Sequence, residues 1–118
     1  MVACVKTVKF PISTVIPAAE ISADFSKDKN NNTVISVTAN NMASADRLTP
    51  PKKTYVVWIK TSDNGVKNIG QLSSKNAKKA FLKTVTSFEP QEIFITAENE
   101  GDVSYPAGIE ISRAVRSR

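Results

Sequence analysis

The sequence predicts an all-β protein, an antiparallel β-sandwich of seven to eight short strands. Its apolar residues are mainly Val and Ile, with only three Leu, and β-branched side chains favour strands. Short segments alternate apolar and polar residues, and turn-forming residues separate them at intervals of about eight to twelve positions. With 118 residues the chain is long enough for one domain with its own core. We expect a sandwich domain over residues 19–113, after an extended lead-in or tether at 1–18 and before a loose tail at 114–118.

The first expected hairpin follows this lead-in. The two prolines of the lead-in disfavour a helix interior or a central strand, so at most one edge strand is expected there. Residues 20–26 and 33–40 each place apolar side chains on one face. The intervening "KDKNNN" favours a turn, because Asn tolerates positive φ and hydrogen-bonds its own backbone.

The stretch "MASADRLTPPKK", residues 42–53, is the longest irregular segment. Its paired prolines lack backbone donors, so we expect a crossover from one sheet to the other, fixed by Leu48. The following "TYVVWIKTSDNGVKNIGQL", residues 54–72, predicts a strand, a turn in which Gly65 can take positive φ, and a return strand. Trp58 is expected in the core between the sheets, and the Tyr55 hydroxyl is expected to cap a loop.

The remaining strands are expected at about 80–86, after a loop over "SSKNAKK", and then within "QEIFITAEN" and "GIEIS" on either side of an "EGD" turn. The long crossover suits a Greek-key connection and therefore an immunoglobulin-like topology. An up-and-down barrel is the alternative.

The composition excludes several kinds of chemistry. Without histidine the chain has no Ser-His-Asp or Cys-His pair, and with one cysteine it has no ordinary zinc site. Its four glycines form no phosphate-binding loop. We therefore expect no enzyme activity, no catalytic residues, no cofactor and no metal.

A cluster of carboxylates provides a candidate binding site. Glu98, Glu100 and Asp102 surround a turn, where they could bind a ligand, hold calcium or act as the acid and base of a carbohydrate-active module. The spacing lacks the ligands of an EF-hand, and a solvated loop is the simpler interpretation.

Charge is unevenly distributed along the chain, whose net charge is +5. Eight lysines and one acid lie between Lys52 and Lys83, whereas six acids and no base lie between Glu89 and Glu110. Charged residues at the solvent-facing positions of strands explain this pattern. Arginine clusters and glycine-rich nucleic-acid motifs are missing, so we expect no nucleic-acid partner.

The segment Val2-Ala3-Cys4 resembles the end of a lipobox, in which small residues precede the cysteine that becomes lipid-modified in bacterial lipoproteins. The basic and apolar regions of a signal peptide are not in the sequence, so this interpretation requires a longer precursor. A free terminal thiol and a buried core cysteine are the alternatives. An acyl anchor at Cys4 would bind the membrane without a spanning helix.

Residues 54–111 resemble the extracytoplasmic C-terminal domain of anti-sigma-K-type factors. The similarity rests on a Tyr-x-x-Trp strand, a glycine turn and a late strand that ends in an acid before a Pro-x-Gly segment. These residues are Tyr55, Trp58, Gly65, Gly70, Glu98, Pro106 and Gly108. The resemblance implies an immunoglobulin-like sandwich outside the cytoplasmic membrane. The sigma-binding domain and membrane helix of that family are not in this sequence, so sigma-factor inhibition is not implied.

These observations together predict a non-catalytic, lipid-anchored domain of the bacterial cell envelope that binds an unknown protein or envelope ligand. Its binding surface is expected on strand edges or on the 42–53 crossover. The alternative is a carbohydrate-binding or carbohydrate-active module that uses the acidic 98–102 turn.

Overall fold

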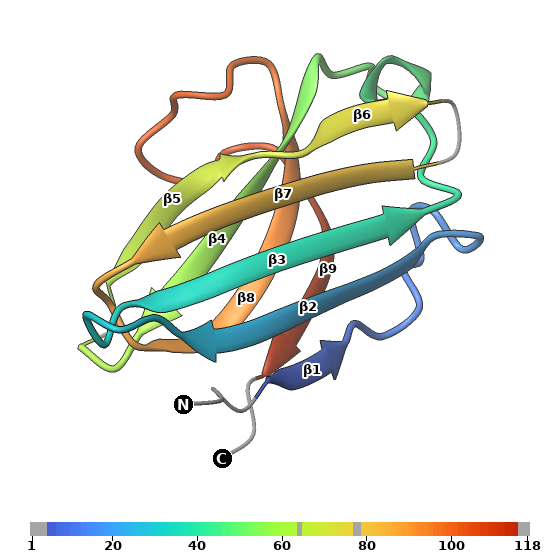
Figure 1. Cartoon of the computed structure of the whole chain (residues 1–118). Helices are drawn as coiled ribbons and strands as arrows, with labels where there is room; N and C mark the ends of the chain where they lie inside the picture. Colours follow the sequence, from blue (N-terminus) through green and yellow to red (C-terminus); the bar gives the residue numbers. More distant parts are fainter. Residues whose placement is uncertain (1–4, 64, 77–78, 116–118) are drawn as a thin grey trace.

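The computed structural model describes residues 5–63, 65–76 and 79–115 of the chain. In these residues the polypeptide forms nine β-strands and one short 3-10 helix, and each pair of neighbouring strands is antiparallel (Figure 1). The strands are β1 (Lys6–Lys9), β2 (Glu20–Lys27), β3 (Thr33–Asn40), β4 (Thr54–Thr61), β5 (Val66–Gln71), β6 (Ser73–Asn76), β7 (Lys79–Thr86), β8 (Pro90–Glu98) and β9 (Ile109–Val115).

Two sheets pack face to face, which confirms the predicted all-β sandwich. One has the strand order β1-β2-β3-β7-β6, and the other has the order β5-β4-β8-β9 (Figure 1). The 42–53 crossover joins β3 to β4 and so passes from one sheet to the other, as expected. One strand more than the expected seven to eight is present among the described residues, since β6 forms where a loop was expected.

The first hairpin confirms its prediction in detail. Strands β2 and β3 pair over their whole length, from Glu20 opposite Asn40 to Lys27 opposite Thr33. In the turn between them Asn31 has a φ of 65°, the conformation that Asn tolerates. The Asp28 carboxylate accepts hydrogen bonds from the backbone N–H groups of Asn30 and Asn32, both at 2.9 Å, so the turn is closed by its own side chain.

A single extended segment, β5 followed by β6, belongs to both sheets. Strand β5 pairs with β4, whereas β6 pairs with β7 on the opposite sheet. The change of sheet follows Gly70, which has a φ of 137° beside a bulge in the β4–β5 ladder. Among the described residues of this hairpin, Gly70 has positive φ, whereas Gly65, which could adopt it, does not.

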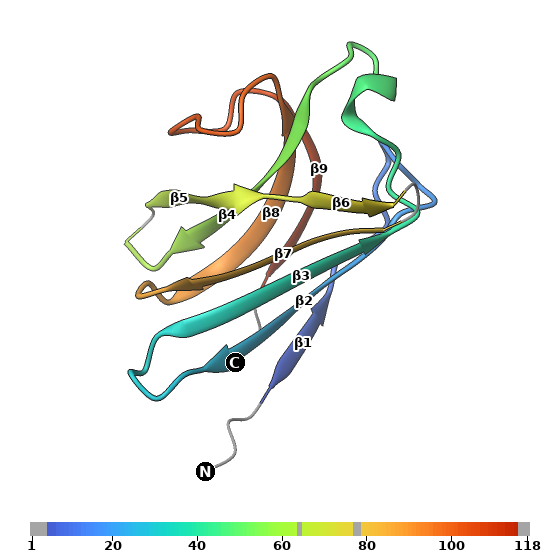
Figure 2. The same cartoon turned by 45° about the horizontal axis from the view of Figure 1, so that its top comes forward.

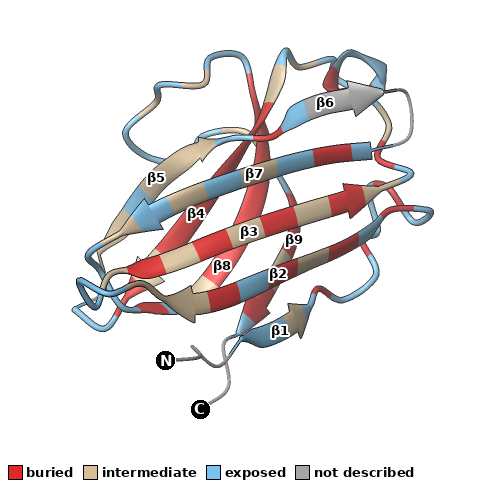
Figure 3. Ribbon diagram, in the orientation of Figure 1, coloured by how far each residue is buried: buried red, intermediate tan, exposed pale blue. Residues whose placement is uncertain are grey.

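The main core lies between the sheets and contains the alternating apolar residues of both inner faces. Figure 3 shows that β3 alternates between buried and half-buried residues, whereas β4 and β8 are buried along nearly their whole length. These two central strands are therefore covered on both faces, as the apolar run in β4 indicated.

The prediction that Trp58 lies between the sheets is wrong. Val57 and Ile59 point into the main core, and because side chains alternate along a strand, Trp58 points to the outer face. There it forms a separate cluster with Val56 and Phe94, which we call the outer cluster, and Trp58 is 0% exposed. Strong burial of an aromatic residue was predicted correctly, but on the wrong face of the sheet.

The molecule measures 44 × 27 × 21 Å along its principal axes. The crossover and the connection between β8 and β9 lie at one end, which is uppermost in Figures 1 and 2. Strand β1 begins and β9 ends at the opposite end (Figure 1). In the described part of the chain, no helix has the length and apolar character needed to cross a membrane.

Candidate functional site

The connection between β8 and β9, residues 99–108, carries two of the three predicted acids, and we call it the acidic loop. Glu98, the last residue of β8, is 3% exposed, whereas Glu100 and Asp102 are exposed on the loop. The structure therefore does not bring the three carboxylates together. No group of three His, Cys, Asp or Glu residues in the described segments is placed to hold a metal ion.

Glu98 closes the base of the acidic loop. Its Oε2 atom accepts hydrogen bonds from the Thr96 hydroxyl at 2.6 Å and from the backbone N–H groups of Ala107 and Gly108 at 3.2 and 3.1 Å. Gly108 must be glycine, because a Cβ atom there would lie 1.8 Å from the Ala97 carbonyl oxygen. These contacts engage the carboxylate within the fold and give it a structural role.

A hydrogen-bond chain connects the loop base to the outer cluster. The indole N–H of Trp58 donates to the Thr96 hydroxyl at 2.8 Å, and this hydroxyl donates in turn to Glu98. The Trp58 and Phe94 rings stack with their centroids 6.2 Å apart and their planes 12° from parallel. Val103 of the loop packs against the same cluster. The acidic loop therefore lies over the outer face of the sheet and shields its aromatic residues from water.

A second contact fixes the middle of the acidic loop to β5. The side-chain amide of Asn68 donates to the carbonyl oxygens of Gly101 and Val103, at 2.8 and 2.9 Å. Tyr105, two residues after Val103 in the same loop, has a side chain that is 70% exposed. The loop is thus held at its base and its middle, and it presents a large aromatic side chain to solvent.

The crossover adjoins the base of the acidic loop. The Lys53 N–H donates to the carbonyl oxygen of Glu98 at 3.0 Å, and the Tyr55 hydroxyl donates to the carbonyl oxygen of Ala43. Leu48 is buried in the main core. Both expectations for this segment, that Leu48 fixes it and that Tyr55 caps a loop, are confirmed. Burial raises the pKa of Tyr55 to about 12, with the Asp46 carboxylate adding to the effect.

The uneven charge of the sequence is partly compensated in space. Arg113 on β9 forms ion pairs of 2.7 Å with Glu92 and Glu110, and its guanidinium lies 4.0 Å from the centroid of the Phe94 ring. Lys60 reaches Glu92 at 3.8 Å. The hydrogen bond from Arg113, aided by Lys60, holds the pKa of Glu92 below its usual range. Glu92 of the acidic 89–110 segment thus forms ion pairs with basic residues of both neighbouring strands.

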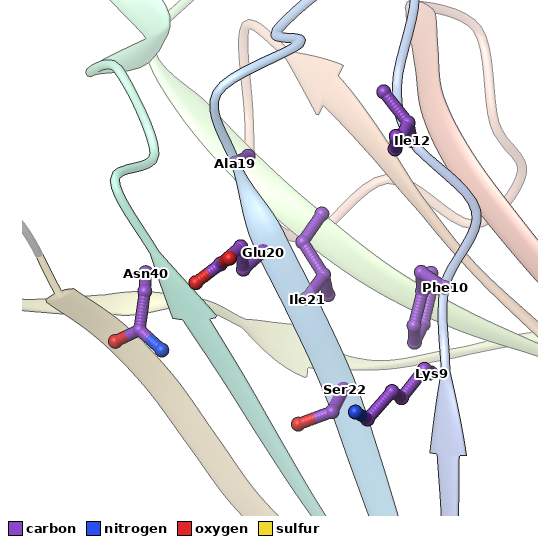
Figure 4. Close-up of a pocket in the computed structure, with 8 residues that line it drawn as sticks. All are labelled: Lys9, Phe10, Ile12, Ala19, Glu20, Ile21, Ser22 and Asn40. Carbon is purple, nitrogen blue, oxygen red and sulfur yellow. The ribbon is translucent and has the colours of Figure 1, made fainter.

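Surface hollows also occur in the described part of the chain, and two of them are lined by none of the predicted acids Glu98, Glu100 and Asp102. One, of about 340 Å³, lies where β1 ends beside β2 (Figure 4). Phe10 and Ile21 form its apolar part, Lys9 points toward Ser22, and Ile12 is 79% exposed. The other, of about 490 Å³, lies between β5 and β7.

Cys4, the predicted lipidation site, lies outside the described residues. The lead-in that follows it contains β1, and the Ser112 hydroxyl of β9 donates to the carbonyl oxygen of Pro11 at 2.8 Å. This part of the lead-in therefore packs against the domain.

Comparison with known proteins finds no relative: no protein-family model, no curated protein and no solved structure matches the chain. The resemblance of residues 54–111 to anti-sigma-K-type factors thus stays a prediction.

Sequence reasoning missed Asn68 and Tyr105. The roles of Asn68 and Glu98 depend on the position of the acidic loop over β5, which no local pattern encodes. A signal for Glu98 did exist, because Phe94, Thr96 and Glu98 alternate along β8 and therefore share one face. Phe94 pairs with Trp58, so an outward-pointing Trp58 places all three residues on the outer face, which the acidic loop covers.

Proposed function

We propose that the chain is a non-catalytic recognition module of the bacterial cell envelope, with immunoglobulin-like topology and a lipid anchor at Cys4. It binds a protein partner with the end of the sandwich formed by the acidic loop and the crossover. The observation that carries this proposal is the exposed Tyr105 on a loop that Glu98 and Asn68 hold in place. Tyrosine on a rigid support supplies a large contact area at little cost in conformational entropy, and it is frequent among residues that dominate binding energy.

The strand order supports the immunoglobulin-like topology. Strands β2, β3, β7 and β6 correspond to A, B, E and D, and strands β5, β4, β8 and β9 correspond to C′, C, F and G, with β1 added ahead. The crossover is then the B–C connection and the acidic loop the F–G connection. In variable immunoglobulin domains these two connections contribute to the antigen-binding end.

The arrangement of the two ends supports an anchored orientation. The first described strand begins at the end opposite the acidic loop (Figure 1). An acyl chain on Cys4, just ahead of this strand, would direct Tyr105 and the crossover away from the membrane. Two or three acyl chains make such an anchor stable, since each buried methylene contributes about 0.8 kcal/mol.

Site-specific crosslinking in the native organism tests the binding end. A photo-reactive amino acid replaces Tyr105 in one variant and Asn30, in the turn at the opposite end, in the matched control. We expect a discrete crosslinked species from position 105 that is absent from position 30. Identical crosslinking patterns, or none at position 105, would overturn the proposed binding end.

Mass spectrometry of the protein from native membranes tests the anchor separately. We expect acylation at Cys4, and loss of the protein from the membrane fraction in a Cys4→Ser variant. An unmodified Cys4 in membrane-extracted protein would refute the anchor and leave the crosslinking result standing.

The carbohydrate module has less support from the geometry. Glu98 is buried and bonded to its own loop, so it does not form an exposed acid–base pair with Glu100 or Asp102. The protein-binding function is therefore the one we adopt.

A further inference from the structure

The hollow between β5 and β7 is a wedge created by the change of sheet. At Gly70 the two strands are in close contact, because a Cβ atom there would lie 3.0 Å from the Leu82 Cδ1 atom. From this point β5 follows β4 in one sheet while β7 follows β3 in the other. The strands separate into a hollow of about 490 Å³, and we call this hollow the wedge. Its lining consists of Val66, Lys67, Asn68, Ile69, Thr84, Val85, Thr86, Phe88 and Ser104.

The strands on either side of the wedge carry polar side chains at inner-face positions, which in the core of a sandwich are normally apolar. Lys67 pairs with Ile59 and Thr84 pairs with Ile35, and both isoleucines belong to the main core. Since directly opposed residues share a face, the side chains of Lys67 and Thr84 point to the inner side of the sandwich. Thr86 does the same, since it pairs with the buried Thr33. A cation and two hydroxyls at inner-face positions depart from the pattern that builds the core, and such departures are typical of functional sites.

Two strand edges border the wedge. Strand β5 is the outermost strand of its sheet, and β6 covers the corresponding edge of β7 only as far as Phe81. No backbone hydrogen bond joins β5 to β7 among the described residues. Every second residue of an edge strand directs its N–H and C=O groups outward. The backbone of β5 over residues 66–69 is therefore a template for a further strand.

The charge of the lining defines the occupant. Lys67 is the only charged residue among the nine that line the wedge, and its ammonium lies 4.9 Å from the centroid of the Phe88 ring. An inward-pointing lysine at a sheet edge discourages pairing with an apolar strand. A strand that brings a carboxylate to this lysine and to the threonine hydroxyls removes that penalty, which makes the lysine a selective element. Phe88, 45% exposed, provides an apolar contact beside it.

We propose that the wedge between β5 and β7 binds an extended peptide segment of a partner protein, which adds to the edge of β5 and places an Asp or Glu side chain against Lys67, Thr84 and Thr86. An apolar side chain of the same segment packs on Phe88. This site is distinct from the exposed Tyr105 and needs neither the lipid anchor nor the crossover.

Selection from a displayed library of random nine-residue peptides tests the proposal with the intact 118-residue chain. We expect enriched peptides with one or more acidic residues flanked by β-branched residues, and micromolar binding of the synthesised peptides in fluorescence polarisation. Replacing the acidic residue of a peptide by its amide should weaken binding about tenfold, which corresponds to about 1.4 kcal/mol. Amide hydrogen exchange should slow over residues 66–69 when the peptide is bound.

Matched variants of the protein locate the site. Lys67→Glu should weaken binding at least tenfold, whereas Lys29→Glu, the same charge reversal in an exposed turn, should leave it unchanged. Thr84→Val preserves the shape of the side chain and removes one hydroxyl, so it should reduce the preference for the acidic peptide over its amide form. This variant tests the site independently in case Lys67→Glu disturbs the fold. The proposal is overturned when no peptide is enriched, when Lys67→Glu and Lys29→Glu bind equally, or when exchange slows elsewhere. A Tyr105→Ala variant should bind the peptide normally, so failure here and failure of the loop-binding function are distinguishable.

Discussion

Replacing Glu98 by alanine should release the acidic loop from the sheet. The substitution removes the acceptor of three hydrogen bonds, one from the Thr96 hydroxyl and two from the backbone N–H groups of Ala107 and Gly108. It also opens space beside the outer cluster, whose Trp58 indole is bonded to the same Thr96. We expect a less stable protein in which the loop is mobile and Trp58 becomes accessible to water.

The magnitude follows from the number and kind of these bonds. A hydrogen bond to a charged group contributes about 1.5–3 kcal/mol, but three donors share one oxygen of Glu98, so the contributions do not add in full. We expect Glu98→Ala to lower the free energy of unfolding by about 3 kcal/mol, in the range found when a buried network is broken. At about 4 °C per kcal/mol for a domain of this size, the melting temperature should fall by about 12 °C.

Urea unfolding followed by fluorescence measures this effect directly, because Trp58 is the only tryptophan of the chain. Glu98→Gln keeps an oxygen acceptor at the same place and should lose only about 1 kcal/mol. Glu100→Ala, at an exposed position of the loop, should change the free energy by less than about 0.5 kcal/mol. The reasoning is refuted if Glu98→Ala unfolds at the wild-type urea concentration, or if its native-state emission is not shifted to longer wavelength.

Two further predictions concern the backbone and pH. Gly108→Ala places a Cβ atom against the Ala97 carbonyl and should lower the free energy of unfolding in urea by more than about 2 kcal/mol. In Gly101→Ala the added Cβ atom meets only the flexible end of Gln71, so the loss should be less than about 0.5 kcal/mol. Equal losses would contradict the conclusion that Gly108 must be glycine. The pKa of Tyr55 is raised from 10.0 to about 12 by burial, so the unfolded chain releases this proton first and stability should fall between pH 10 and pH 12. Tyr55→Phe, which cannot ionise, should show a smaller loss over that interval in pH-dependent unfolding, and an unchanged slope would refute the link.

Local patterns were sufficient to predict the sandwich, the first hairpin and the crossover. Alternation in residues 20–26 and 33–40 fixes which side chains face the core, and it holds in the structure residue by residue. The turn was readable because Asn31 needs the positive φ that its residue type tolerates. These features depend on neighbours in sequence, so the sequence reports them directly.

The side of the sheet on which Trp58 lies could not be predicted in the same way. In β4, Val56, Val57, Trp58 and Ile59 are consecutive apolar residues, so alternation does not mark an inner face. What decides the face is the acidic loop, whose Val103 packs against the outer cluster that contains Trp58 although it lies far away in the sequence. Likewise β6 forms on "SSKN" because it pairs with β7, and its sequence has little strand preference of its own.

Asn68 connects the acidic loop and the wedge. Its side chain holds two carbonyl groups of the loop and accepts a hydrogen bond from the Gly70 N–H at 2.9 Å, and the residue also lines the wedge beside Ser104 of the same loop. A peptide that adds to β5 would order the strand that carries Asn68, and through it the loop that presents Tyr105. The two proposed sites should therefore favour each other's occupancy, and reciprocity requires the same factor in both directions. Asn68→Ala removes this connection, so it should reduce the coupling between the sites more than it reduces peptide affinity.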